Sequence, residues 1–370
     1  MRFPSIGATI RFALAASTVT AASVLGAASV LGAAGCGDSG PVQQAPARLP
    51  STAPIEAITY DALFVVNGGD HTISVIDTEQ RRVAGVIRVE NALFPHHVYL
   101  NRAGTKMLVA APGMDLSGGH VGHHGGSSPP GAVLLLDTRT GATIASRTLP
   151  LMNHNAIFSP GDESEIWTTQ FDGYVWVLDA VTLERKAMIR VENGPAEVTF
   201  SLDGRYAYVA NSESRSVSII DPSTKTVTKT IPVGNTPVGA WQGSNGKAYV
   251  DNETDGTISV IDTLNLNVLQ TYRLGFTPGM VSFGPDQNVW VADTYNAKVA
   301  IRDGVEPDRV VANVSAGQGA HGIVFNGDKK TAYISNQDAN TVTVLDIGSR
   351  AVLATIPVGT KPNGMVWRKK

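Results

Sequence analysis

Between residues 58 and 368 the sequence repeats one pattern of four short segments seven times. One segment of each copy is an apolar run that ends in aspartate, and these residues are Asp77, Asp137, Asp179, Asp221, Asp262, Asp303 and Asp346. Most neighbours in this series lie 41 to 43 residues apart. The segments are four to seven residues long, are apolar or alternate apolar with polar residues, and are bounded by Gly, Asn, Asp or Pro. This pattern is typical of short β-strands joined by tight turns.

Seven copies of a four-stranded unit predict an all-β fold, a seven-bladed β-propeller with four antiparallel strands in each blade. A solenoid is the alternative, but it should show capping repeats at its ends, and none is visible. The repeat region starts inside one copy, at the FVVN segment, and stops after the PNGMVW segment. We therefore expect the N- and C-terminal strands to pair in one blade and to close the ring without an open edge.

The repeated phrases resemble those of the YVTN-repeat family of bacterial β-propellers. Two of them are Tyr208-Val209-Ala210-Asn211 and Tyr333-Ile334-Ser335-Asn336, and the resemblance covers residues 58–368. It implies the propeller fold for a domain at residues 58–370. It does not imply an activity, because one fold serves many chemistries.

The first 35 residues are predicted to be a bacterial signal peptide. Arg2 and Arg11 precede an uncharged stretch of small and apolar residues that runs to Gly35. The sequence Leu31-Gly32-Ala33-Ala34-Gly35-Cys36 resembles a lipobox, although Ala33 stands where Leu is usual. The resemblance implies lipidation of Cys36 and an exported protein held in the cell envelope, in the periplasm or at the outer surface. A transmembrane anchor and a plain cleaved signal are the alternatives.

Residues 36–57 carry this cysteine and then a stretch rich in Pro, Gln, Ser and Ala, which predicts a flexible tether. Cys36 is the only cysteine of the chain, so no intramolecular disulfide can form. The net charge is −3 and the basic residues are dispersed, which argues against a nucleic-acid partner. The expected partners are the membrane, through the lipid, and an envelope protein or polysaccharide; the protein itself is expected to be a monomer.

Three of the eight histidines occupy the same repeat position. His96, His154 and His321 stand where an innermost strand begins, and the other copies place Ala196, Val238, Gly279 and Asn363 there. Innermost strands of a propeller surround its central channel, so these side chains are predicted to converge at one mouth of the channel together with His97. Imidazole binds zinc, copper, nickel and iron. The sequence therefore predicts a site for copper, zinc or iron, or for haem.

The remaining histidines map to the same face and are predicted as accessory ligands. His71 lies in one loop, while His120, His123 and His124 lie in a Gly-rich insertion, residues 113–131, of about 18 extra residues. Methionine sulfur favours copper. Met114 lies in the insertion, and Met152 and Met280 lie near the starts of innermost strands, although packing is the favoured interpretation of each.

Glu197 is the candidate catalytic residue, since it stands one position after the histidine position, where another copy has His97. It could serve as a general base beside a metal-bound water, or it could pair structurally with a neighbouring blade. The repeated aspartates are predicted to be structural, as acceptors of turn hydrogen bonds.

The leading functional hypothesis is an envelope propeller that binds a metal ion or a haem-type cofactor for redox or cofactor handling. At the level of fold it resembles the d1-haem domain of cytochrome cd1 nitrite reductase and the copper-cluster domain of nitrous oxide reductase. The chain has no Cys-x-x-Cys-His motif, so neither activity is carried over. A protein- or polysaccharide-binding scaffold is one alternative. A metal-dependent lyase or hydrolase is another, since Ala320-His321-Gly322-Ile323 resembles repeats of streptogramin lyase propellers.

Overall fold

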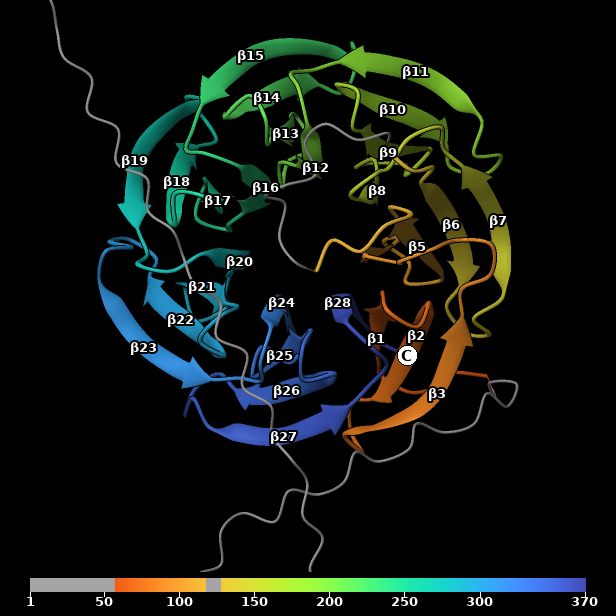
Figure 1. Ribbon diagram of the computed structural model, residues 1–370, viewed down its shortest axis with the longest axis vertical. Coiled ribbons are helices and arrows are strands. Elements are labelled where there is room, and N and C mark those ends of the chain that lie inside the picture. The colour runs from red at the N-terminus through yellow and green to blue at the C-terminus, as the bar shows by residue number, and fades with distance from the viewer. Residues whose placement is uncertain (1–56, 118–127) are drawn as a thin grey trace, which may run out of the picture. The chain divides into compact units, whose positions relative to one another are not determined.

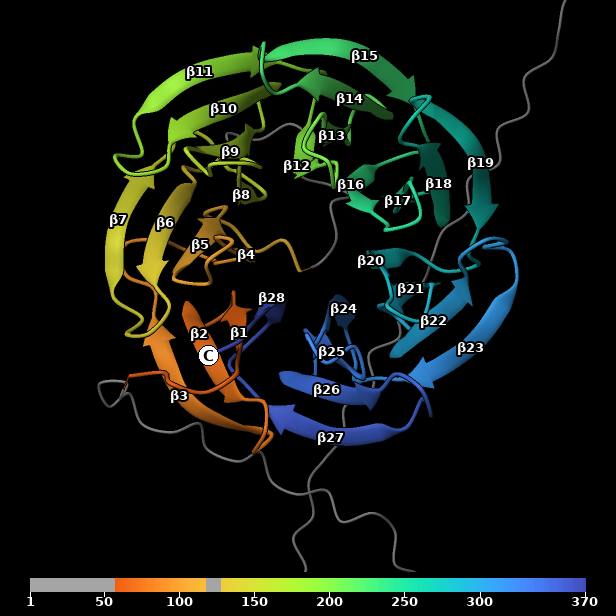
Figure 2. The same ribbon diagram turned by 180° about the vertical axis from the view of Figure 1, so that it is seen from behind.

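The computed structural model describes residues 57–117 and 128–370, and in them the chain forms seven four-stranded antiparallel sheets. The sheets stand around a central axis like blades (Figures 1 and 2). The seven-bladed β-propeller predicted from the repeats is confirmed. The predicted signal sequence, Cys36, the predicted tether up to residue 56, and His120, His123 and His124 lie outside the described residues. Within the described part of the chain, no helix is long and apolar enough to cross a membrane.

The strands follow one another with short connections. In chain order they are β1 (Ala62–Asn67), β2 (Thr72–Asp77), β3 (Arg82–Arg88), β4 (His97–Leu100), β5 (Lys106–Ala111), β6 (Ala132–Asp137), β7 (Thr143–Thr148), β8 (Ala156–Phe158), β9 (Glu165–Gln170), β10 (Tyr174–Asp179), β11 (Arg185–Arg190), β12 (Pro195–Phe200), β13 (Ala207–Asn211), β14 (Ser216–Asp221), β15 (Thr226–Pro232), β16 (Pro237–Gln242), β17 (Lys247–Asn252), β18 (Thr257–Asp262), β19 (Asn267–Arg273), β20 (Pro278–Phe283), β21 (Asn288–Asp293), β22 (Lys298–Asp303), β23 (Val310–Ser315), β24 (Ala320–Phe325), β25 (Thr331–Asn336), β26 (Thr341–Asp346), β27 (Val352–Pro357) and β28 (Pro362–Arg368).

Six blades are consecutive in sequence, and the seventh combines both ends of the propeller domain in the order β28-β1-β2-β3. In the seventh blade Leu63 of β1 pairs with Trp367 of β28. The buried guanidinium of Arg368 secures the junction, since it donates to the carbonyl oxygens of Thr138 (2.6 Å), Ile58 (2.8 Å) and Tyr60 (3.0 Å). Strand order and side-chain contacts thus join the two ends of the domain.

The hydrophobic core lies between neighbouring blades. The second and third strands of each blade are almost entirely buried, whereas the outermost strands expose every other residue or more. Leu63 and Val65 of one blade, for example, pack with Val342 and Val344 of the next. Apolar runs in the middle strands and polar alternation at the rim therefore follow from the depth of each strand.

The repeated polar residues stabilise turns and strand ends. Asp137 Oδ1 accepts from the backbone N–H of Arg139 and of Thr140, both at 2.9 Å, so the structural role predicted for the aspartates is confirmed. The asparagine that ends the second strand, as at Asn67, donates to Thr72 Oγ1 (2.9 Å) and Ser74 Oγ (3.0 Å) of the third strand.

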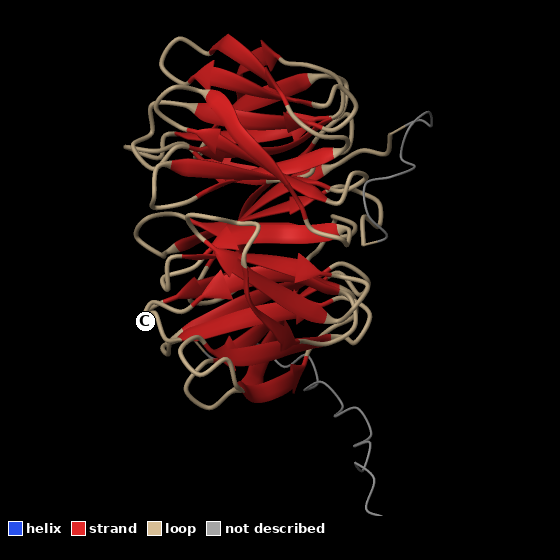
Figure 3. Ribbon diagram, turned by 90° about the vertical axis from the view of Figure 1, so that its left-hand side faces the viewer, coloured by secondary structure: helices blue, strands red, loops and turns tan. Residues whose placement is uncertain are grey.

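Two faces follow from this topology, seen edge-on in Figure 3. We define the top face by the loops that precede the innermost strands and by those that join the second and third strands. The remaining turns form the bottom face. All histidines of the described residues lie in or beside top loops, because they precede or begin an innermost strand or follow a second strand.

Candidate metal centre

Three imidazoles meet where the innermost strands β4 and β8 begin. The ring centroids of His96 and His97 are 4.6 Å apart, those of His96 and His154 are 4.7 Å apart, and those of His97 and His154 are 5.2 Å apart. Each residue has one ring nitrogen that lies within 4.8 Å of those of the other two, and all three side chains are buried. Among the described residues this is a group of side chains spaced closely enough to hold one metal ion.

The local backbone places these rings at the channel. His96 follows Pro95, and its N–H donates to the carbonyl oxygen of Ala110 in the second strand at 2.9 Å. The N–H of His154 donates to Thr169 Oγ1 at 3.3 Å. A Cβ at Gly364 of β28 would lie 2.7 Å from the oxygen of His96 and 3.2 Å from Nδ1 of His97, so only glycine allows β28 to approach this closely.

The carboxylate of Glu197 contacts two of the three imidazoles. Its Oε1 lies 3.0 Å from His97 Nε2 and 3.4 Å from His154 Nδ1. Its Oε2 lies 3.4 Å from Asn155 Nδ2, and Asn155 is itself held by Val198, through bonds of 2.8 and 3.0 Å to the backbone. Glu197 thus reaches from β12 to imidazoles of two other blades. We name His96, His97, His154 and Glu197 the hub cluster.

The hub cluster is enclosed. Its histidines are 3 to 5% exposed and Glu197 is 1% exposed, so any charge there must be compensated by a partner. A cavity of about 10 Å³ lies against it, lined in part by His97, His154 and Glu197. That volume is close to the minimum needed by one water molecule.

His321 approaches the cluster without joining its tightest group. Its ring centroid is 6.3 Å from that of His96, it is partly exposed, and it lines the same small cavity. The sequence hypothesis placed His96, His154 and His321 on equal terms, whereas the geometry brings His97 closer than His321. His71 does not join the group: it has a positive φ of 56° and its ring packs against Phe94, with centroids 5.2 Å apart.

Asp251 is a buried residue of the site that sequence reasoning missed. Its Oδ1 accepts from Trp241 Nε1 at 2.8 Å and from the N–H of Gly239 at 3.2 Å, and Asp251 lines the same cavity as His97 and Glu197. Burial raises the pKa of Asp251 well above its ordinary value, and the negative charges of Glu253 and Glu197 raise it further. Its place in the second strand gave a signal, since the same position holds Ala210 or Ser335 in other copies.

Tyr99 was also missed. Its ring stacks on His97 with centroids 6.2 Å apart and an interplanar angle of 23°. Desolvation raises the pKa of Tyr99 far above its ordinary value, and the charge of Glu197 raises it further. The phenol therefore stays protonated beside the carboxylate and keeps its hydrogen available for donation.

The methionines fit packing better than ligation. Met280 lines the cavity, but its sulfur accepts from the N–H of Ile323 at 3.5 Å. Met152 is 5% exposed and Met114 is partly exposed in its loop, and neither lines this cavity.

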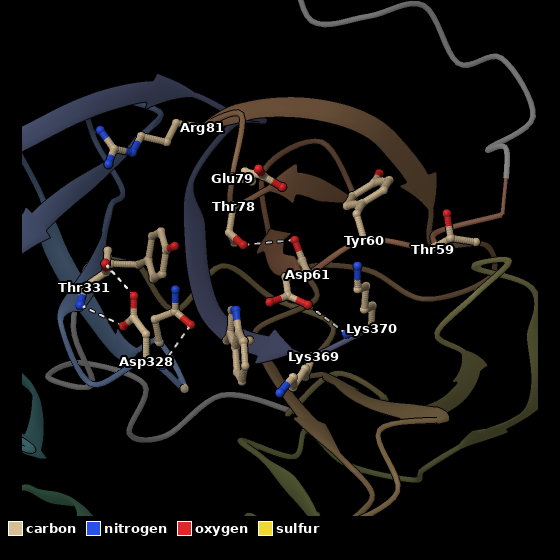
Figure 4. A pocket seen from close by; sticks show the side chains of 14 residues that line it. Thr59, Tyr60, Asp61, Thr78, Glu79, Arg81, Asp328, Thr331, Lys369 and Lys370 are labelled. Carbon is tan, nitrogen blue, oxygen red and sulfur yellow. Dashed lines mark hydrogen bonds between the residues drawn. The ribbon is translucent and has the colours of Figure 1, made fainter.

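A larger cavity, of about 750 Å³, opens on the bottom face between two blades (Figure 4). Several of its polar groups already bind one another: the N–H of Lys370 donates to Asp61 Oδ1 at 2.9 Å, and that of Thr331 donates to Asp328 Oδ1 at 3.2 Å. None of the described histidines lines it. It therefore does not share the hub chemistry.

Comparison with known proteins places the chain by its fold. Residues 149–303 match the family described as "Domain of unknown function (DUF5074)". No curated protein matches the chain. Among solved structures, the chain is similar to the dihydro-heme d1 dehydrogenase NirN in complex with DHE, with 18% identity and a TM-score of 0.62 over 88% of this chain and 79% of that one.

Two further similar structures come from named bacteria. The periplasmic gluconolactonase PpgL of Pseudomonas aeruginosa is 18% identical, with a TM-score of 0.66 over 83% of this chain and 98% of that one. Hydrazine synthase of Kuenenia stuttgartiensis is 16% identical, with a TM-score of 0.61 over 75% of this chain and 95% of that one. At these identities the likeness shows the fold alone: the chain is a seven-bladed propeller similar to proteins of several different activities.

Proposed function

We propose that this protein binds one transition-metal ion at the top of its central channel, with His96, His97 and His154 as ligands and Glu197 as the fourth. The observation that carries the proposal is the spacing of the donor atoms. Two ligands about 2.1 Å from one ion lie about 3.0 Å apart at a right angle and about 3.4 Å apart at a tetrahedral angle. The two distances from Glu197 Oε1 to imidazole nitrogens, 3.0 and 3.4 Å, match these values.

The surroundings of His96 support its role as a ligand. The amide of Asn363 lies 2.7 Å from His96 Nδ1. With its oxygen turned toward the ring, this amide would accept from Nδ1–H and leave Nε2 with a lone pair for the ion. Metal-binding histidines commonly donate their second ring nitrogen to such an acceptor, which fixes the tautomer.

The donor set and the cavity favour a bare ion of zinc, copper or iron over haem. Imidazole with one carboxylate suits these metals. The cavity of about 10 Å³ has room for an ion or a water, whereas a porphyrin would have to displace buried side chains. The name of NirN, a dihydro-heme d1 dehydrogenase, supports a haem-type molecule on a similar fold, but the cavity argues against haem within the hub cluster.

A bound ion of this kind supplies Lewis-acid or redox chemistry. The proposed roles of the surrounding residues are the same for both kinds of chemistry. Glu197 neutralises positive charge, Tyr99 holds a hydrogen-bond donor beside it, and Trp241 closes one side, with its ring 6.5 Å from that of His97. As a ligand, Glu197 would not be the general base of the sequence hypothesis. A metal-dependent lyase or hydrolase therefore needs another base.

We also propose that the protein is exported and held in the cell envelope by a lipid on Cys36. The support is the lipobox-like sequence and the similarity to a propeller named as periplasmic. The alternative is a metal-free scaffold that binds an envelope protein or polysaccharide. Purified protein that contains no metal would favour this alternative.

The metal proposal is tested on the full chain purified without a histidine tag. Elemental analysis should find close to one transition-metal ion per chain, and X-ray absorption should show nitrogen and oxygen neighbours at about 2.0 to 2.2 Å. His71→Ala is the matched control, because His71 lies on the same face outside the cluster. Protein that holds no metal as purified and gains none on titration would contradict the proposal.

A further inference from the structure

We propose that a pocket beside the hub cluster binds a small neutral polyhydroxyl molecule, such as a single sugar ring. The pocket has a cavity volume of about 260 Å³ and is lined by top-face residues that include Glu253, Thr277, Gln318, His321, Gln337 and Asp338. We name it the seam pocket. Its volume lies just below the range of pockets that hold drug-sized ligands, so it suits a smaller molecule.

Gln337 gives the strongest indication that the seam pocket has a ligand. Its side chain is 1% exposed, and its Nε2 has no hydrogen-bond partner in the described structure. Its backbone is held in place, since its N–H donates to the oxygen of Gly319 at 2.8 Å. A buried amide group without a partner costs about 1 to 3 kcal/mol. Because Nε2 itself is buried, a ligand would recover that cost once the Gln337 side chain turns its amide toward the pocket.

The charges of the seam pocket disfavour anions. Two carboxylates, of Glu253 and Asp338, line it. Its one lysine, Lys361, already directs Nζ to Asp115 Oδ2 at 2.8 Å and to Ser117 Oγ at 2.7 Å. A phosphorylated or carboxylated ligand would therefore meet repulsion without a cation to offset it.

The mixture of donors and acceptors favours hydroxyl groups over a simple cation. A hydroxyl both donates and accepts, so it can serve the carboxylates and the amide N–H of Gln337. An ammonium group only donates and would leave that amide hydrogen without an acceptor. Thr277 and Gln318 add side chains that can do either.

The seam pocket adjoins the hub cluster. His321, Glu253 and Gly279 line both the pocket and the small hub cavity. A molecule held in the pocket would thus lie next to the proposed metal, and in this respect the inference rests on the proposed function. His321 is then a contact between ligand and hub, which accounts for its place just outside the tightest group.

The test is saturation-transfer NMR on the full chain with D-glucose and D-xylose as neutral probes, and with glucose 6-phosphate and glucosamine as the charged comparisons. We expect signals from the neutral sugars and much weaker ones from the phosphate. Gln337→Met keeps the length of the side chain but removes its hydrogen-bond donor, so sugar affinity should fall about tenfold. Thr277→Val is a second variant in the same pocket, and Gln270→Met, on the exposed strand β19, is the control that should bind as wild type.

Absence of neutral-sugar signals, preference for glucose 6-phosphate, or unchanged affinity in both pocket variants would overturn the proposal. The measurements are made on metal-loaded and on chelator-treated protein. Sugar binding that is retained in chelator-treated protein supports the seam pocket independently of any metal in the hub cluster. Metal binding retained in Gln337→Met, with sugar binding lost, assigns the defect to the pocket alone.

Discussion

At the scale of single residues, Glu197 contributes the negative charge that two imidazoles share. Glu197→Gln keeps the shape of the side chain and removes this charge. We expect metal affinity to fall by tenfold to a hundredfold or more, because loss of even an outer partner of a metal ligand has that effect. Calorimetric titration of the metal-free protein measures it, with Glu192→Gln as control, since Glu192 is exposed in the loop before the same strand. Equal affinities for the Glu197 variant and wild type would exclude Glu197 as a ligand.

The raised pKa of Asp251 predicts how the stability of the protein depends on pH. Burial raises its pKa in the folded protein, so between the unfolded pKa of about 3.9 and the higher folded value the unfolded chain loses a proton that the folded chain keeps. Stability should therefore fall as pH rises through this window, by up to about 1.4 kcal/mol for each unit of the shift.

Asp251→Asn removes this titration while leaving an oxygen to accept from Trp241 Nε1. In metal-free protein we expect the variant to be about as stable as wild type near pH 4 and increasingly more stable toward pH 7. Urea unfolding at several pH values tests this. A stability difference that does not change with pH would show that Asp251 is ionised in the folded state.

At the scale of elements, the pairing of β28 with β1 joins the ends of the domain, and Arg368 reinforces it. Arg368→Met should leave three carbonyl oxygens without their charged donor. We expect the free energy of unfolding to fall by about 3 kcal/mol. Lys369→Met, one residue further and exposed, should change it little. Thermal or urea unfolding measures the difference. An Arg368 variant as stable as the Lys369 variant would show that backbone pairing of β28 with β1 alone holds the two ends together.

The strands were predictable from the sequence. The pattern of apolar and polar residues in each strand follows from its depth in the blade, and turn residues mark the strand ends. The hub was predictable only in part. Alternation along a strand would send His96 and His97 to opposite sides, but β4 begins at His97, so His96 lies in a loop and both rings reach the channel. Asp251 was missed because the candidate residues were taken from loops and from the positions where innermost strands begin, whereas Asp251 lies within a second strand. Its hydrogen bond from Trp241 depends on contacts that a repeat alignment does not contain.

At the scale of the whole molecule, the proposed lipid anchor predicts where the protein resides. Cys36→Ala should release it from the membrane fraction or mislocalise it, because the tether then carries no acyl chains. Cell fractionation with detection of the chain measures this. Membrane association that persists in the variant would favour a transmembrane anchor over a lipid.

The central claim is that the hub cluster of this propeller is a metal site. Its most direct test is calorimetric titration of the metal-free full chain with zinc, copper and nickel, for wild type and for the triple variant His96→Ala, His97→Ala, His154→Ala. We predict one tight site per wild-type chain and its loss in the triple variant, with His71→Ala binding as wild type, provided that circular dichroism shows each protein folded. A folded triple variant that binds metal as tightly as wild type would contradict the account.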